Sequence, residues 1–153
     1  LMGDILSGIA IGISIIVAIM TFRSDAKRQK TELEAVYFKE IYQKTLIKDI
    51  PDARGYIRFE KDGKLAGTDP LIDELKNIMQ ISRYFLYIDG AFYSELKENV
   101  QNLEDYLVNN TDKVYSSEEE ASVHIKIHTQ LEKIYKIISD KYLGKEFKRK
   151  KKI

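Results

Sequence analysis

The longest apolar run of the chain covers residues 5–22, ILSGIAIGISIIVAIMTF, and contains no charged side chain. As an α-helix this run would span roughly 27 Å, which is close to the hydrocarbon thickness of a bilayer. A cleaved signal peptide would need basic residues before the run and small residues at its end, and a buried core helix in so short a chain would show a polar face. We therefore expect residues 1–22 to form a single transmembrane helix that anchors the chain.

The charges on either side of the apolar run predict its orientation. Asp4 precedes the run, whereas several basic residues follow it closely. Positively charged flanks stay in the cytoplasm, so we expect the N-terminus outside and everything from residue 23 onward on the inner side of the inner (cytoplasmic) membrane. The basic residues that we expect to contact lipid here are Arg23, Lys27, Arg28 and Lys30.

Small residues recur at four-residue spacing within the expected anchor. Gly8 and Gly12 form a Gly-x-x-x-Gly pair, which lets two helix backbones approach closely in lipid. Glycine and alanine are common in membrane helices, so the alternative is a set of small residues without a partner helix. The spacing favours a homo-oligomer, and the residues concerned are Gly8, Ala10, Gly12, Ser14 and Ala18.

Apolar residues at helical spacing dominate the rest of the chain and predict an all-α cytoplasmic bundle over residues 23–144. The first helix is expected to continue from the anchor and to end at Asp49-Ile50-Pro51, since a residue before proline avoids the helical region. Its expected apolar stripe consists of Leu33, Val36, Tyr37 and Ile41.

The second helix is expected between two clear signals. Asp69-Pro70 is typical of a helix start, with a capping aspartate followed by proline, and Asp89-Gly90 should end the helix. The preceding residues 50–69 are expected to form a loop or short β-hairpin, because Asp62-Gly63 is a turn signal. The expected buried face of the second helix is Leu71, Leu75, Ile78, Met79, Ser82, Phe85 and Leu86.

Two more helices complete the expected bundle. One covers about residues 91–108, and the last begins at Ser116 or Ser117, each of which has a glutamate three residues later at capping-box spacing. The last helix should end near Gly144. The expected buried residues of these two helices are Tyr93, Leu96, Val100, Leu103 and Leu107, and then Ile127, Leu131, Ile134, Tyr135, Ile138 and Tyr142.

Short connections make neighbouring helices antiparallel, so we expect an up-down bundle of about four helices. The first helix would lead away from the membrane and the fourth would return, which brings the basic tail, residues 145–153, back to the bilayer. The net charge of the whole chain is only +1. Residues 23–30 carry +3, residues 145–152 carry +5 and Asp4 carries −1, so residues 31–144 sum to about −6.

This charge distribution favours attraction of the tail to an anionic inner leaflet, where each basic residue contributes about 1 kcal/mol. Binding of the tail to nucleic acid, or a solvated tail without a specific role, are the alternatives. The tail residues expected to contact lipid are Lys145, Lys148, Arg149, Lys150, Lys151 and Lys152.

The sequence offers few groups for chemistry. It has no cysteine, which excludes disulfides and thiolate metal sites. His124 and His128 stand four residues apart on one helix face and are weak candidates for metal ligands, although the Glu of the zinc-protease pattern is replaced by Ile125. The same histidines also fit the edge of a core. No catalytic motif or cofactor fingerprint is present, so we expect no enzyme and no cofactor.

Aromatic and arginine residues gather around the end of the second helix, in SRYFLYIDGAFY, residues 82–93. Both residue types are enriched in recognition sites, so this corner is a possible pocket for an anionic ligand. The alternative is that the rings close the end of the bundle. The residues of the expected corner are Arg54, Arg58, Arg83, Tyr84, Tyr87 and Tyr93.

The first functional hypothesis is a non-enzymatic, membrane-anchored interaction protein that self-associates and recruits a protein partner at the inner membrane surface. The layout resembles membrane effectors and accessory proteins of bacterial defence systems. The second hypothesis is therefore a ligand-gated effector, whose cytoplasmic domain senses a nucleotide or another anion and whose anchors assemble to disrupt the membrane. A metal-dependent bundle enzyme is the third. Expected partners are membrane lipids, a second copy and an unidentified protein.

Overall fold

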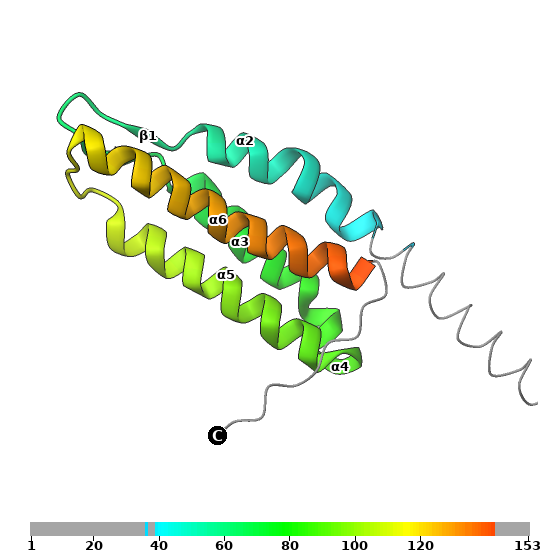
Figure 1. Ribbon diagram of the computed structural model, residues 1–153. Coiled ribbons are helices and arrows are strands. Elements are labelled where there is room, and N and C mark those ends of the chain that lie inside the picture. The colour runs from blue at the N-terminus through cyan, green and yellow to red at the C-terminus, as the bar shows by residue number, and fades with distance from the viewer. Residues whose placement is uncertain (1–35, 37–38, 143–153) are drawn as a thin grey trace, which may run out of the picture. The chain divides into compact units, whose positions relative to one another are not determined.

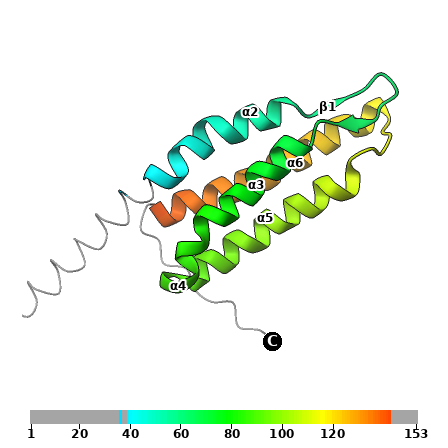
Figure 2. The same ribbon diagram turned by 180° about the vertical axis from the view of Figure 1, so that it is seen from behind.

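Helices in the computed structural model pack side by side with their axes nearly aligned (Figures 1 and 2). The structure describes residues 36 and 39–142, and residues 39–142 belong to one compact unit. The expected anchor, the basic segment after it and the basic tail lie outside the described residues. Among the residues that are described, no helix is both long enough and apolar enough to cross a bilayer.

The first helical segment runs through the predicted break at Pro51, so that prediction was wrong. Residues 39–44 are helical, a π-helical turn follows at Thr45–Asp49, and α2 continues over Ile50–Gly55. The backbone N–H of Ile50 donates to the carbonyl of Thr45, five residues earlier. The wider turn places Pro51 in the first turn of α2, where its missing N–H costs little.

The buried face of this segment differs from the expected stripe. Val36 is exposed and Ile41 is half-buried, whereas Tyr42, Thr45 and Ile50 are buried. The π-turn inserts an extra residue into the helical repeat, so the buried positions Thr45 and Ile50 are five residues apart, a step that a regular 3.6-residue period does not anticipate. Leu33 and Tyr37 of the expected stripe lie outside the described residues.

A short β-hairpin follows α2 and confirms the expected turn at Asp62-Gly63. Strands β1 (Arg58–Phe59) and β2 (Leu65–Ala66) are antiparallel, with Phe59 opposite Leu65. Gly63 has φ +81°, and a Cβ there would lie 2.2 Å from the carbonyl oxygen of Tyr115. Glycine is therefore required by both the turn and the close approach. The expected loop over residues 50–69 is shorter than predicted, because α2 occupies its first six residues.

The second predicted helix is divided into α3 (Asp69–Ile81), a 3₁₀ turn at Ser82–Tyr84 and α4 (Phe85–Ile88). Ser82 is fully buried, and its hydroxyl donates to the carbonyl of Ile78 at 2.6 Å. The Tyr42 hydroxyl in turn donates to the Ser82 Oγ at 2.6 Å. A serine that bonds back to the preceding turn bends a helix, so this buried pair accounts for the break.

The break also changes which residues face the core. Leu86 is 47% exposed and Met79 is half-buried, so both predictions of burial were wrong, whereas Phe85 is buried. The first turn of α3 differs in its cap as well. The N-cap is Thr68, not Asp69, and the Thr68 hydroxyl donates to Thr111 Oγ1 at 2.6 Å.

Helix α5 (Gly90–Asn110) begins at Asp89, whose carboxylate accepts the backbone N–H of Phe92 at 3.1 Å. The second carboxylate oxygen of Asp89 binds Lys141 Nζ at 2.8 Å. Phe92 is buried in place of the predicted Tyr93. The Asp89 cap fixes where the first turn of α5 begins, and this determines which residue of that turn faces the core. The remaining predicted core positions of α5 are all buried: Leu96, Val100, Leu103 and Leu107.

Helix α6 (Ser117–Tyr142) starts with the predicted capping box. The Ser116 backbone N–H donates to Glu119 Oε2 at 2.9 Å, and the Glu119 N–H donates to Ser116 Oγ at 3.4 Å. Tyr135 is half-buried and Tyr142 is 53% exposed, so these two differ from the prediction. The buried residues of α6 are Val123, Ile127, Leu131, Ile134, Ile137 and Ile138.

The described chain is therefore predominantly helical, with one small hairpin, as the sequence predicted. Four helical segments alternate in direction, and α5 packs against both α3 and α6 (Figure 1). The hairpin lies at one end of the bundle and α4 at the other (Figures 1 and 2). We call these the hairpin end and the α4 end. At the hairpin end, Lys64, which immediately precedes β2, also forms an isolated antiparallel bridge with Val114 in the α5–α6 connection.

Asp89 offers a direct test of the α4 end. We expect Asp89→Ala to lower the free energy of unfolding by about 2–3 kcal/mol, because it removes both the cap of α5 and the carboxylate that binds Lys141. Asp89→Asn retains a capping oxygen and should cost about 1 kcal/mol less. Urea unfolding followed by circular dichroism measures both, with Asp73→Asn on the exposed face of α3 as the control. Equal losses in the two Asp89 variants would contradict a contribution from the cap.

Candidate functional site

The expected ligand corner is divided between the two ends of the bundle. Arg83 and Tyr84 lie in the 3₁₀ turn and Tyr87 lies in α4, at the α4 end. Arg54 lies in the last turn of α2 and Arg58 begins β1, at the hairpin end. The two groups are separated by the length of α3, about 20 Å for thirteen residues. The continuation of α2 through Pro51 carries Arg54 and Arg58 away, so the structure does not bring the predicted residues together.

Phe85 is the side chain that closes the α4 end of the core. It is 1% exposed, its ring stacks on Tyr42 with centroids 6.3 Å apart, and it meets the edge of Phe92 at 4.9 Å. Lys141 Nζ lies 5.8 Å from the centroid of the Phe85 ring. The expected alternative, in which aromatic rings close the bundle, therefore describes Phe85, whereas Tyr87 is 87% exposed.

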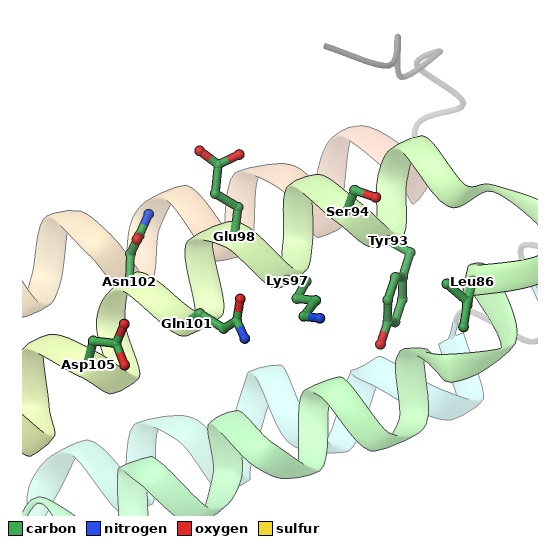
Figure 3. A pocket seen from close by; sticks show the side chains of 8 residues that line it. All are labelled: Leu86, Tyr93, Ser94, Lys97, Glu98, Gln101, Asn102 and Asp105. Carbon is green, nitrogen blue, oxygen red and sulfur yellow. The ribbon is translucent and has the colours of Figure 1, made fainter. Parts of the chain in front are cut away.

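Tyr93 and Leu86 lie at one end of a shallow groove along the polar face of α5 (Figure 3). The groove has a volume of about 400 Å³. Tyr93, Lys97 and Gln101 follow one another at four-residue spacing and point to the side of α5 that faces α3 (Figure 3). Its lining mixes one basic residue with acidic and amide residues, so the groove shows no preference for an anion.

A larger groove lies between α2 and α6 and was not anticipated from the sequence. It has a volume of about 600 Å³, which is in the range of small-molecule and side-chain binding sites. Apolar side chains form part of its lining, and ionisable side chains form the rest. The lining residues are Ile50, Pro51, Arg54, His128, Leu131, Glu132, Tyr135 and Lys136.

Tyr135 crosses this groove and connects the two helical segments. Its hydroxyl donates to the carbonyl of Leu46 at 2.5 Å, across 89 positions of sequence. Burial raises the pKa of the Tyr135 hydroxyl, and the nearby Arg54 guanidinium opposes the rise to a smaller extent. The neutral phenol is therefore the form that the folded state favours.

The two histidines occupy different environments on α6. His124 is exposed, and its ring meets the edge of Phe59 from the hairpin with centroids 5.2 Å apart. His128 Nε2 lies 3.2 Å from Glu132 Oε1, one turn later on the same helix. Over the described residues no three His, Cys, Asp or Glu side chains come together in a way that could hold a metal ion. His124 therefore lies on the surface in contact with the hairpin, and its predicted role is not tested by the structure.

The residues predicted for self-association and lipid contact lie outside the described residues. They are the small residues of the anchor at positions 8–18, the basic residues at 23–30 and the basic residues of the tail at 145–152. Their roles remain predictions.

Replacing Tyr135 tests the contact across the α2–α6 groove. Tyr135→Phe should cost about 1 kcal/mol of unfolding free energy at neutral pH, because the Leu46 carbonyl loses its donor. Since the folded-state pKa is raised, the contribution of Tyr135 is complete below about pH 10, the pKa of an unfolded tyrosine, and is lost as the pH rises through the folded-state pKa.

The difference in unfolding free energy between the wild type and Tyr135→Phe should therefore stay constant up to about pH 10 and narrow over the range above about pH 10 in urea titrations. Tyr87→Phe, at an 87% exposed position, is the matched control and should leave stability unchanged. A gap that stays constant over this range would contradict the role of the phenol.

Comparison with known proteins adds no assignment to these surfaces. The chain matches no protein-family model, no curated protein and no solved structure at a significant level. The geometry of the bundle and the chemistry of its surfaces are therefore the basis for a functional proposal.

Proposed function

We propose that this chain is a non-enzymatic, membrane-anchored interaction protein, which self-associates through its anchor and bundle and recruits a protein partner at the inner membrane surface. The observation that carries the proposal is the position of the two ends of the described chain. The start of the first helical segment and the end of α6 both lie at the α4 end of the bundle (Figures 1 and 2). The apolar run and the basic tail thus connect to the same end.

Contacts between the first and last helical segments support this arrangement. A cavity of about 300 Å³ is lined by Lys39 and Tyr42 from the first segment and by Tyr142 from the end of α6. A chain that leaves and returns at one end can place both of its basic flanks on one surface, as contact with an anionic leaflet requires.

The charges of the bundle are polarised in the same direction. Residues 39–44, 81–93 and 133–142, at the α4 end, contain six basic and three acidic residues, net +3. Residues 58–66 and 104–120, at the hairpin end, contain eight acidic and four basic residues, net −4. An anionic surface would attract the α4 end and repel the hairpin end, which gives the bundle a preferred orientation.

The α2–α6 groove is the surface that we assign to the partner. Ile50, Pro51 and Leu131 offer apolar contact, and Arg54 and Lys136 add positive charge beside it. This combination suits an amphipathic segment with apolar anchors flanked by carboxylates. A partner could occupy the groove while the anchors associate in the membrane, because the groove lies along the side of the bundle.

Membrane attachment and self-association can be tested together in the full chain. We expect the protein to sediment with membranes after lysis, to resist extraction by high salt and to dissolve only with detergent. Gly8→Leu and Gly12→Leu should reduce crosslinked dimers several-fold without releasing the protein from membranes, because they block close approach of two helices. Ile11→Leu is the control within the same segment. Recovery of the intact protein in the soluble fraction would overturn the proposal.

A ligand-gated membrane effector is the second candidate, because Arg54 and Lys136 place two cationic side chains around the α2–α6 groove, beside the His128–Glu132 pair. An anion in this groove could alter the contact of Tyr135 with Leu46, and thereby the coupling of the two segments. The effector role and the recruitment role differ in their effect on the membrane itself.

Expression of the full chain in bacterial cells that carry a potential-sensitive dye separates the two roles. Recruitment predicts a normal membrane potential at high expression. The effector role predicts depolarisation, which Gly8→Leu and the charge reversal Arg54→Glu should both abolish, whereas Lys76→Glu on the exposed face of α3 should not. Polarised cells at high expression would exclude a constitutively active effector.

A further inference from the structure

The α4 end carries a continuous run of exposed apolar side chains. Leu86 is 47% exposed, Tyr87 is 87% exposed and Ile88 is 41% exposed. We call these three residues the α4 tip. Single apolar residues are normal on protein surfaces, but three consecutive exposed apolar residues at the tip of a bundle suit contact with another molecule or a membrane.

The structure holds the α4 tip firmly in this exposed position. Phe85, which immediately precedes it, is buried against Tyr42 and Phe92 and points into the core. Asp89, which immediately follows it, caps α5 and binds Lys141 at 2.8 Å. With both ends fixed, the three side chains between them cannot turn into the core without breaking these contacts.

The position of the α4 tip indicates what it contacts. It lies at the same end as the start of the first helical segment and the end of α6, where the chain connects to the apolar run and to the basic tail (Figures 1 and 2). The neighbouring segments of the bundle carry a net +3, and the sequences beyond them carry +3 over residues 23–30 and +5 over residues 145–152. Apolar side chains surrounded by positive charge suit the surface of an anionic bilayer.

The side chains themselves fit the boundary between headgroups and acyl chains. Leu86 and Ile88 are purely apolar, and Tyr87 combines an apolar ring with a hydroxyl, the composition found in the aromatic belts of membrane proteins. Arg83, one turn before the tip, is exposed and can reach lipid phosphates. A water-soluble partner would account for the apolar residues but not for the net positive charge of the described segments at the same end.

We propose that the α4 tip inserts shallowly into the anionic bilayer to which the chain is anchored, and so docks the bundle on the membrane through its α4 end. This inference rests on the proposed membrane attachment and adds a second contact to it. The docked bundle would keep the acidic hairpin end in the cytoplasm and would leave the α2–α6 groove open along its side. A bundle held by its anchor alone would have no fixed orientation.

The absence of tryptophan from the chain allows a direct test. Tyr87→Trp introduces a single fluorescent reporter at the α4 tip, at a position where 87% exposure makes the larger ring tolerable. Tyr56→Trp places the same reporter at the hairpin end, where Tyr56 is 59% exposed. Each full-length variant is reconstituted into vesicles of phosphatidylcholine and phosphatidylglycerol, with and without brominated acyl chains.

The indole in Tyr87→Trp should emit at shorter wavelength in vesicles than in the protein unfolded by denaturant. Brominated lipids should quench its fluorescence several-fold more than the fluorescence of the indole in Tyr56→Trp. Iodide in the aqueous phase should quench the fluorescence of Tyr56→Trp more than that of Tyr87→Trp. Equal quenching of both variants by brominated lipids would overturn the inference. Shielding of Tyr87→Trp from lipid and iodide alike would also overturn it, because a second protein surface would then cover the tip.

Flotation of the same vesicles separates this inference from the proposed function. Protein that does not float with the vesicles contradicts membrane anchoring itself. Protein that floats, but whose Tyr87→Trp reporter is not quenched by brominated lipids, retains the anchor and refutes docking through the α4 tip. Vesicles of phosphatidylcholine alone should weaken the quenching of Tyr87→Trp, because the positive segments then lose their anionic partner.

Discussion

The contact between Asp89 and Lys141 organises the α4 end, and the positions of the other elements there depend on it. One carboxylate oxygen caps α5 and the other binds an ammonium group at the end of α6. Both side chains are largely shielded from water, with 23% and 13% of their surfaces exposed, so the pair is screened less than a surface ion pair. This contact joins the turn after α4 to the last helix. It thereby sets where α4 ends and which of its side chains face outward.

Local signals explain how much of the fold the sequence could predict. The capping box of Ser116 and Glu119 and the turn at Asp62-Gly63 involve residues within a few positions of one another, and both are present. The π-turn before Pro51 and the break at Ser82 depend instead on packing. Ser82 becomes a partner of Tyr42 only when two segments forty residues apart meet. No spacing rule within a single helix reveals such a contact.

The candidate sites were predicted less well than the fold for the same reason. Grouping Arg54 with Tyr87 required knowledge of which end of the bundle each would occupy, and this depended on the continuation of α2. The α2–α6 groove joins Arg54 to Lys136 across 82 positions of sequence, a relation that only the packing of the bundle creates. Within the predicted corner Tyr87 is exposed, and the buried ring at this end is Phe85, which the prediction had placed in the core of the second helix and not in the corner.

The π-turn at Thr45–Asp49 has a consequence for the direction of the chain before it. One additional residue in a helical turn rotates everything on its N-terminal side by about 100° relative to a regular helix. The extra residue of the π-turn therefore determines which side of residues 39–44 packs against the bundle. Loss of one residue from the π-turn during evolution would leave a regular helix. Residues 39–44 would then turn a different side, with a different set of side chains, toward α3.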